Sequence, residues 1–348
     1  MPKARIILGH GSGGKLSHDL IKSLFMPPFI NPILEAGDDS AVFPLTHSDK
    51  IPQGQQLSKE DIAFTTDSYV VKPIFWPGGD IGKLAVCGTV NDLAMVGAIP
   101  LYLSAAFVIE EGLPISSLRR IVTSMKRAAK EARVKIVAGD TKVVERGGAD
   151  SLFINTTGVG MLSRGVRISG RNAQPGDMII LSGTIGDHGI AVLSAREGLV
   201  FSSSFKSDVA PLNHMTRAML RTSHKIHAMR DPTRGGLATT LNEIAQQSKV
   251  GIRIIEKQIP IREEVAAACE ILGFDPLYVA NEGKVVACIA PEDAEKVVQV
   301  MRRTHYGHEA AIIGEVLPEP KARVVMKTQV GGTRIVDMLT GDMLPRIC

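Results

Sequence analysis

Three stretches of sequence that each contain an aspartate decide the fold of this chain. They are FTTDSYVV at residues 64–71, TVNDLAMVGA at 89–98 and AGDTKVVERG at 138–147. The first and the third begin with β-branched and small apolar residues, which predicts strands that end in turns at Asp67 and Asp140. The second stretch ends a run with apolar residues at helical spacing. Each of these elements therefore brings an acidic residue into an apolar setting.

Outward from these stretches, strands and helices alternate along most of the chain. The predicted strands cover 62–66, 101–109, 134–138, 152–162, 178–181, 252–256 and 284–290, with short strands over 310–338. The predicted helices cover 80–96, 187–197, 208–222, 235–247, 262–272 and 292–303, and one more starts at Pro114. Such alternation predicts an α/β (α+β) fold in each half of the chain.

The length of 348 residues is about twice that of a usual domain, which predicts two domains. A boundary is expected near 163–176, where Arg, Gly, Ser and Pro dominate. The expected parts are a flexible glycine-rich N-terminal arm with the loop that follows it (1–60), an N-terminal domain (61–163), a C-terminal α/β domain (164–338) and a mobile tail (339–348). The tail has turn-forming residues and no apolar periodicity.

Composition excludes several classes of protein. Hydrophobic residues make up 44% and charged residues 22%, which excludes a largely disordered chain. A net charge of +4 with 4% aromatic residues argues against a nucleic-acid-binding protein. The longest uncharged run, 93–109, is interrupted by Gly97 and Pro100 and is just short of a membrane span. None of the cysteines has CxxC spacing, and no secretory segment is seen, so a cytoplasmic protein with free thiols is expected.

Acidic residues of four motifs are candidates for a metal and nucleotide site: Asp38 and Asp39 in GDDSAV, Asp67, Asp92 and Asp140. Loop ends of α/β sheets bind ligands, and Mg²⁺ takes carboxylate oxygens while it shares phosphates with a nucleotide. Carboxylates from separate segments are therefore predicted to converge on magnesium and ATP. The alternative is that each aspartate caps a helix or closes a turn. Asp92 favours a site most, because a carboxylate in an apolar helix needs a partner.

Two glycine-containing segments are candidates for phosphate binding. Residues 9–15, GHGSGGK, offer backbone N–H groups and the cation Lys15, although the pattern departs from a P-loop at residue 16, and a flexible arm explains it equally well. Residues 231–236, DPTRGG, precede a predicted helix whose N-terminus attracts anions, and Arg234 is placed to meet phosphate there. An ordinary capped turn is the alternative.

Two further residues have side chains suited to chemistry. Glu282, in ANEGK, lies between two aliphatic stretches and is a candidate general base if buried, or otherwise a turn residue. Cys348 is the final residue and follows Leu-Pro-Arg-Ile. It is not a prenylation motif, which needs three residues after the cysteine. A thiol at a chain end has few steric constraints, although composition alone would make it incidental.

Taken together, the motifs strongly resemble the HypE family of hydrogenase maturation factors, in the superfamily of aminoimidazole ribonucleotide synthetase and selenophosphate synthetase. The motifs are GDDSAV (37–42), FTTDSYVV, TVNDLAMVGA, AGDTKVVERG, NTTGVG (155–160), RDPTRGGLATTLNEIA (230–245), ANEGK (280–284) and the terminal PRIC (345–348). The resemblance covers essentially the whole chain. It implies a mixed α/β N-terminal domain that binds ATP and forms a homodimer, and a second α/β layered domain.

The resemblance also implies a reaction. A partner carbamoyltransferase places a carbamoyl group on Cys348, and this chain uses ATP to dehydrate the S-carboxamide to an S-cyanide. The cyanide then reaches the iron of a nickel–iron hydrogenase through an iron-carrying maturation scaffold. By resemblance, the magnesium and ATP set is Asp38, Asp67, Asp92 and Asp140. Lys142 and Glu282 are implied to orient and deprotonate the carboxamide.

One departure from the superfamily narrows the alternatives. Selenophosphate synthetases have a reactive Cys or selenocysteine in the N-terminal glycine-rich segment, where this chain has Ser12. Two other functions stay open from the residues alone. One is a free-standing ATP-dependent synthetase of a small amide or ribonucleotide, for which the PRIC tail would have no purpose. The other is a non-catalytic scaffold that binds nucleotide and partner proteins.

Overall fold

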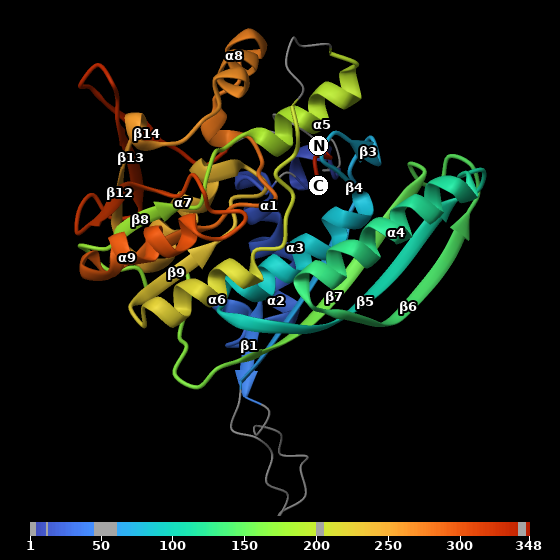
Figure 1. Ribbon diagram of the computed structural model, residues 1–348, viewed down its shortest axis with the longest axis horizontal. Coiled ribbons are helices and arrows are strands. Elements are labelled where there is room, and N and C mark those ends of the chain that lie inside the picture. Colours follow the sequence, from blue (N-terminus) through green and yellow to red (C-terminus); the bar gives the residue numbers. More distant parts are fainter. Residues whose placement is uncertain (1–4, 12, 45–60, 200–204, 340–345) are drawn as a thin grey trace, which may run out of the picture.

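A computed structural model describes residues 5–11, 13–44, 61–199, 205–339 and 346–348 (Figure 1). Two large sheets, one in each half of the chain, organise these residues. Ser12 and residues 340–345 of the tail, to which two of the expectations above apply, lie outside the described residues, as does the loop 45–60.

The first sheet has five strands in the order β1-β2-β7-β5-β6. The strands are β1 (Ala41–Pro44), β2 (Asp61–Tyr69), β5 (Ala98–Glu110), β6 (Lys135–Val144) and β7 (Leu152–Leu162). Only β5 and β6 pair in parallel, and a small hairpin of β3 (Phe75–Trp76) and β4 (Gly79–Asp80) stands apart. Inward residues of β7 alternate with half-buried ones along the whole strand, as expected for a sheet covered on one side.

Helices α3 (Ile81–Met95) and α4 (Ile115–Ala132) cover one face of the first sheet (Figure 1). Asp80 caps α3, since its carboxylate accepts hydrogen bonds from the N–H groups of Gly82 and Lys83 at 2.9 and 3.0 Å. Nearly every residue of α3 is buried. The reason is that α3 packs on the sheet, on α4 and on α6 of the second half. This helix therefore joins the two domains.

The second sheet has seven strands in the order β14-β13-β10-β12-β8-β11-β9. The strands are β8 (Met178–Leu181), β9 (Ile226–Arg230), β10 (Gly251–Ile255), β11 (Val286–Ile289), β12 (Ala311–Leu317), β13 (Arg323–Lys327) and β14 (Thr333–Val336). The helices of this half are α5 (Asp187–Glu197), α6 (Asn213–Thr222), α7 (Gly236–Ser248), α8 (Glu263–Leu272) and α9 (Pro291–Arg302). Side chains of α7 pack on one face, and those of α6 and α9 pack on the other.

The N-terminal segment is more ordered than the expectation of a flexible arm and loop over 1–60. Its described residues form the 3₁₀ turn Leu8–Gly11, α1 (Lys15–Leu20), a π-helical turn (Ile21–Phe25), α2 (Met26–Phe29), a second 3₁₀ turn (Leu34–Ala36) and β1. β1 pairs antiparallel with β2 and so belongs to the first sheet. The backbone N–H of Lys15 also donates to the carbonyl of Leu339 at 2.9 Å.

Two local expectations differ from the structure. The Gly-Asp pair at 139–140 looks like a turn, yet β6 continues through it to Val144, because nine of its residues pair in parallel with β5. The helix expected from residue 208 begins at Asn213. Strand β9 was not predicted, since its sequence IHAMR has no clear period. Asp140 is therefore a mid-strand residue.

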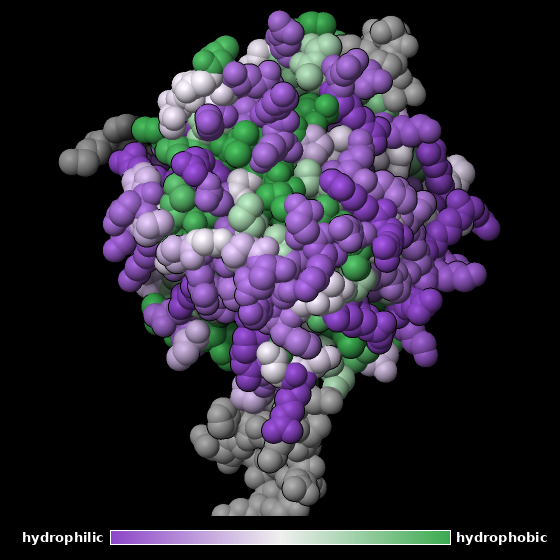
Figure 2. All heavy atoms as spheres, turned by 60° about the vertical axis from the view of Figure 1, so that its left-hand side comes forward, coloured by the Kyte–Doolittle hydropathy of each residue, from purple (hydrophilic) through white to green (hydrophobic). Residues whose placement is uncertain are grey.

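The face of the first sheet opposite α3 and α4 is left uncovered in the described chain. Tyr102 and Phe64 on this face are 48% and 42% exposed. Edge strand β6 is exposed along almost its whole length. By contrast, the side of the second domain seen in Figure 2 is mostly hydrophilic, with apolar side chains in small patches. Within the described ranges, no helix is long and apolar enough to cross a membrane.

Candidate active site

A cleft of about 370 Å³ lies where the N-terminal segment, the first domain and the second domain meet. Strand β2 and helix α3 supply one wall, and the turn from β9 to α7 supplies the other. The lining side chains include His10, Ser17, His18, Asp39, Thr65, Thr66, Asp67, Tyr69, Asp92, Arg230, Asp231, Thr233, Arg234, Thr240, Glu243, Glu282 and Cys348. Five of these are carboxylic acids other than Glu243, which makes the cleft strongly acidic.

The acidic side chains reach the cleft from separate segments. Asp67 lies on β2, and Asp92 lies near the end of α3, where its carboxylate accepts a hydrogen bond from the Thr65 hydroxyl at 2.9 Å. Asp231 follows β9 directly, and Asp39 precedes β1. The structure thus brings together Asp67 and Asp92, which were predicted, with Asp39, which was named beside Asp38, and with Asp231, which was not proposed as a ligand.

The pKa values of these carboxyl groups are all raised. Burial is the main cause for Asp67, and the charge of Arg234 opposes it. Burial raises the pKa of Asp92 well above its usual value, and the charges of Asp231 and Asp67 add to the effect. Burial and the charge of Asp39 do the same for the pKa of Asp231. Such mutual repulsion between half-buried carboxylates would be relieved by a bound cation.

An ion-paired cluster closes one end of the cleft. Arg230 contacts the carboxylates of Asp39 at 3.2 Å and Glu243 at 2.6 Å, and His18 of α1 contacts Glu243 at 3.0 Å. Burial still raises the pKa of Asp39 to about 6. Asp38, by contrast, accepts hydrogen bonds from the Ser169 hydroxyl and the Gly170 N–H at 2.9 and 2.8 Å, outside the cleft lining.

Glu282 is the most deeply placed acid of the cleft. Its residue is 3% exposed, and its Oε1 atom has no hydrogen-bond partner among the described residues. The backbone N–H of Glu282 donates to the Asp208 carboxylate at 3.1 Å, which fixes the loop. Burial raises the pKa of Glu282 well above its usual value, and the charges of Asp231, Asp208 and Asp67 contribute further. A buried carboxyl group with a raised pKa and an unbonded oxygen is a candidate to exchange a proton with a bound substrate.

The end of the C-terminal tail is docked against both domains. The backbone N–H of Lys72 donates to the carbonyl of Arg346 at 3.2 Å, and the backbone N–H of Val70 donates to a terminal carboxylate oxygen of Cys348 at 3.4 Å. On the other side, the His188 ring bonds to the Ile347 carbonyl at 2.9 Å. Ile347 itself is 3% exposed and packs in the core of the first domain. The tail was expected to be mobile, and its last three residues have this defined binding place.

Arg346 anchors the tail through its side chain. Its guanidinium forms an ion pair with Asp150, donates to the carbonyl of Val70 at 3.0 Å, and lies over the Phe153 ring at 5.8 Å. Arg196 of α5 in turn donates to the Arg346 carbonyl at 2.6 Å. These contacts place the residue two positions further on, Cys348, at the wall of the cleft.

The environment of Cys348 keeps its thiol protonated. Burial raises the pKa of the thiol, and the charges of Glu282, Asp67 and Asp231 raise it further, while Arg234 opposes them. A protonated thiol is a poor nucleophile. In the docked position, Cys348 is therefore suited to present a group already attached to sulfur and not to attack a new donor.

Four of the predicted site residues do not line the cleft: Lys15, Asp38, Asp140 and Lys142. Asp140 and Lys142 form an exposed pair at 2.7 Å on β6. Strand register places Asp67, Thr156, Ala105 and Gly139 in one row across the sheet, and Ser68, Asn155, Ala106 and Asp140 in the next. Adjacent rows face opposite sides of a sheet. Asp140 and Lys142 thus point to the uncovered face, away from Asp67.

The donor set of the cleft fits a hard cation that shares a nucleotide. Its oxygen ligands are half-buried carboxylates with raised pKa values, and the orphaned Oε1 of Glu282 lies among them. In the described part of the chain, no three His, Cys, Asp or Glu side chains are close enough to form a complete metal cage. Mg²⁺ usually binds through one or two carboxylates plus phosphate oxygens, so such a cage is not required.

Comparison with known proteins identifies both domains. Residues 37–162 match the family model described as AIR synthase related protein, N-terminal domain, and residues 174–327 match its C-terminal domain. The chain is 52% identical to the carbamoyl dehydratase HypE of Cupriavidus necator over 344 residues, which cover 99% of this chain and 95% of that protein. The chain belongs to the HypE family. It is a carbamoyl dehydratase of hydrogenase maturation.

Solved HypE structures have the same fold. One HypE in complex with ATP is 48% identical, covers 99% of this chain and 100% of its own, and superposes with a TM-score of 0.81. A HypE–HypF complex is 51% identical, covers 92% of this chain and 99% of its own, and has a TM-score of 0.84. The predicted family and the predicted two-domain α/β fold are therefore both confirmed.

Sequence reasoning on this HypE chain missed some residues of the cleft and did not separate two others. Asp38 and Asp39 were both named, and alternation of side chains at the start of β1 was the only signal that could have shown that Asp39 is the one in the cleft. Asp231 stands in the motif whose Arg234 was predicted. Arg230 and Glu243 stand in the same motif, thirteen residues apart, and their 2.6 Å ion pair could not be predicted without the turn between β9 and α7.

Proposed function

We propose that this chain dehydrates an S-carboxamide on its own Cys348 to an S-cyanide, with consumption of ATP, and so supplies the cyanide ligand of a nickel–iron hydrogenase. The observation that supports this most is the position of Cys348, which lines the same acidic cleft as Glu282 and Asp67. The terminal sulfur is therefore both substrate carrier and part of the site. The oxygen of the carboxamide leaves with phosphate, and its nitrogen loses two protons.

ATP and Mg²⁺ are proposed to bind in the cleft, which the complex of a related HypE with ATP supports. Bound ATP would supply the γ-phosphate that turns the carboxamide oxygen into a leaving group, and Mg²⁺ held by carboxylates of the cleft would offset the charge on the phosphates. Asp67 and Asp92 are the proposed magnesium ligands, whereas the carboxylate of Asp38, also predicted, is bonded to Ser169 and Gly170 outside the cleft. Arg234 lies at the cleft wall, where its guanidinium can stabilise phosphate charge, and Lys15 begins the adjacent α1.

Glu282 is proposed to remove a proton from the carboxamide nitrogen. Its carboxylate faces the cleft with Oε1 unbonded among the described residues, and its raised pKa makes it a stronger base than an ordinary glutamate. The buried Ile347, next to Cys348, closes the tail side of the cleft against water. Exclusion of water favours elimination to the nitrile over hydrolysis of the activated group.

A homodimer is proposed to complete the site. The uncovered face of the first sheet is apolar around Phe64 and Tyr102, and the edge strand β6 lacks a neighbour among the described residues. Exposed edges and apolar faces of this size are normally covered by another chain. A second copy packed on this face would bring its own Asp140 and Lys142 toward a cleft that they cannot reach within one chain, where Lys142 would orient the carboxamide.

A carbamoyltransferase is the proposed donor of the carbamoyl group, and an iron-carrying maturation scaffold is the proposed acceptor of cyanide. A solved HypE–HypF complex supports a partner protein at the first step. The docked thiol is half-buried at the cleft wall and its pKa is raised, so we propose that loading requires the tail to leave the cleft. Residues 346–348 are held by backbone hydrogen bonds, by the contacts of the Arg346 side chain and by the buried Ile347, and release of the tail would break these contacts.

The decisive experiment follows the mass of the C-terminal peptide after incubation with a carbamoyl donor, the partner transferase and ATP. We expect the mass of a carbamoyl adduct without ATP and that of a cyano adduct with ATP. Cys348→Ala should show neither adduct, yet calorimetry should show unchanged ATP binding, because the aspartates are elsewhere. Cyanide formation by Cys348→Ala would contradict the proposal and favour a free-standing synthetase of a small amide.

A matched variant separates a general loss of thiols from a loss at this position. Cys269 is a buried cysteine of α8 outside the cleft, so Cys269→Ala should keep both adducts on Cys348. If ATP were bound without any adduct in the native chain, a nucleotide-binding scaffold would be the better description.

A further inference from the structure

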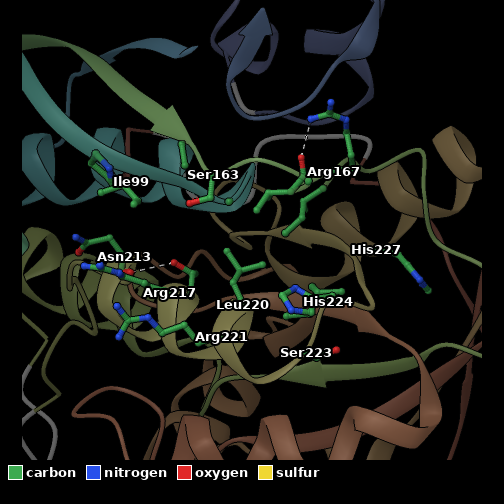
Figure 3. Close-up of a pocket in the computed structure, with 18 of the residues that line it drawn as sticks. Ile99, Ser163, Arg167, Asn213, Arg217, Leu220, Arg221, Ser223, His224 and His227 are labelled. Carbon is green, nitrogen blue, oxygen red and sulfur yellow. Dashed lines mark hydrogen bonds between the residues drawn. The ribbon is translucent and has the colours of Figure 1, made fainter. Parts of the chain in front are cut away.

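A second and larger cavity lies on another side of the molecule. It is formed by the start of β5, the connection that follows β7 and one side of α6, and its volume is about 1310 Å³. None of its lining residues lines the acidic cleft. Figure 3 shows Arg217, Leu220 and Arg221 of α6 on one wall, with Ile99, Ser163 and Arg167 on the other. We call this cavity the arginine groove.

The charge of the arginine groove is of one sign. Its lining contains no Asp, no Glu and no Lys, although the whole chain has 40 basic and 36 acidic residues. Its six arginines are Arg133, Arg164, Arg167, Arg171, Arg217 and Arg221. Arg167 contacts Asp61 at 3.1 Å, and within the described ranges the other five have no ion-pair partner. Such uncompensated charge is favourable only where an anionic ligand binds or where water screens it.

The floor of the arginine groove is apolar and rigid. Ile168 and Ile226 are 7% and 4% exposed and belong to the core on the α6 and α9 side of the second sheet. Val166 and Leu220 pack against the same core and reach the groove. An apolar centre bordered by arginines is the composition of a protein–protein interface, where Arg is enriched and Lys is depleted.

We propose that the arginine groove binds an acidic segment of a partner protein in which carboxylates alternate with apolar side chains. Guanidinium groups bind carboxylates through two parallel hydrogen bonds, which an ammonium group cannot do, and this fits the exclusive use of Arg. The volume exceeds the roughly 300–1,000 Å³ of usual small-molecule pockets. Three histidines line the groove, His214, His224 and His227, but no Phe, Tyr or Trp does, so bases of a nucleic acid would find few stacking surfaces.

The two walls suit such a segment. Arg217 and Arg221 are four residues apart on α6, so they project from one side of the helix with Leu220 between them. Arg167 lies on the facing wall (Figure 3). An extended segment therefore meets cations on both sides while its apolar side chains contact Leu220 and Ile99. This site does not depend on the proposed chemistry of Cys348.

The test uses the full-length protein and a fluorescein-labelled synthetic peptide of Glu-Glu-Leu repeats, followed by fluorescence anisotropy. We expect saturable binding that weakens as salt rises, and no competition by ATP. Arg217→Gln with Arg221→Gln should weaken binding by about tenfold or more, the loss expected for two charged hydrogen-bonded contacts. The matched control replaces Arg119 and Arg127, two exposed arginines of α4 outside the groove, and should bind as the native protein does.

Several outcomes would overturn the proposal. They are no saturable binding of the peptide, an equal loss in the α4 control, or equal binding of a Gln-Gln-Leu peptide. Inorganic triphosphate or a single-stranded RNA that binds as tightly and with the same dependence on Arg217 and Arg221 would make the groove a general anion site instead. Unchanged peptide binding by Cys348→Ala would separate this site from the active cleft, so the two proposals fail independently.

Discussion

The two sheets of this protein differ in how many of their faces are covered by helices of the same chain. The central strands of the second sheet are buried on both faces, by α7 on one side and by α6 and α9 on the other. The first sheet has helices on one face only, and its edge strand β6 is exposed. The second sheet is therefore covered by its own chain, whereas the first sheet has an uncovered face on which a second copy can pack.

This difference concerns function as well as stability. Strand register places Asp140 and Lys142 on the uncovered face of the first sheet. Glu282 and Cys348 line the cleft on the other side of this sheet. If all four residues act in one reaction, two copies of the chain share active sites across the uncovered face of the first sheet. The predictions below test this contrast, from the largest effect to the smallest.

The largest expected effect is on activity. Glu282→Gln and Lys142→Ala should each lower the rate of cyanide formation on the order of a hundredfold or more, the range for loss of an acid–base group. A mixture of the two variants should recover activity, because a mixed dimer has one site with both native residues. Random pairing would give about a quarter of the native rate, since half of the dimers would have one intact site.

The control for this experiment mixes two variants of one residue set. Glu282→Gln mixed with Asp92→Asn should not recover, because both residues line the cleft of the same chain. Recovery in that control, or none in the Lys142 mixture after subunit exchange, would place Lys142 in its own chain's site or outside the site altogether.

A charge placed on the uncovered face of the first sheet should separate the two copies. Tyr102→Asp puts a carboxylate at the apolar centre of this face, which should raise the dimer dissociation constant by about thirtyfold or more, the effect of losing an interface hot spot. Sedimentation velocity over a range of concentrations would measure it. Val330→Asp makes a similar change at a 95% exposed position of the second domain and should leave the association unchanged.

The free energy of unfolding should depend more on side chains of the second sheet than on those of the uncovered face of the first sheet. Leu181→Ala, in the centre of the second sheet and fully buried, should lower the free energy of unfolding by about 2–5 kcal/mol. Phe64→Ala on the uncovered face should cost at most about 1 kcal/mol in a dissociated background such as Tyr102→Asp. Urea unfolding followed by circular dichroism compares the two. Equal losses of unfolding free energy would show that this face of the first sheet is covered within the chain.

The smallest effect concerns pH at the junction of the two domains. Burial lowers the pKa of His188, although the charge of Asp208 opposes this. The neutral ring therefore contributes stability that is present above its ordinary pKa of 6.5 and is lost as the pH falls toward the lowered folded value. The urea midpoint should fall between pH 8 and pH 5.5 by more in the native protein than in His188→Gln. A parallel fall in both would exclude His188 as the cause.

Most of the fold could be predicted from the sequence, because the main helices have clear apolar periods. The stripe of α4 and the proline before it predict that helix well. Local pattern failed at Gly139-Asp140, where pairing with β5 overrides the turn preference of these residues. It failed again in the N-terminal segment, where short helical turns gain their order from contacts with Arg234 and Leu339.

The site could be predicted only as far as single residues suggest chemistry. Asp67 and Asp92 stand out because each is acidic in an apolar setting. The pairing of Arg230 with Asp39 joins segments that are far apart in the sequence, so no local signal announces it. The face on which Asp140 lies depends on the register of β6, which is fixed by pairing with β5 and not by its own sequence.

The buried side chain of Ile347 sets how often Cys348 is available to another protein. Burial of such a side chain is worth about 1.5–3 kcal/mol. By itself this burial therefore limits the fraction of molecules with a released tail to roughly one in ten to one in a hundred. A partner that reacts only with the released thiol would have its apparent affinity reduced by the same factor. A smaller residue at this position would load faster, at the cost of a cleft open to water.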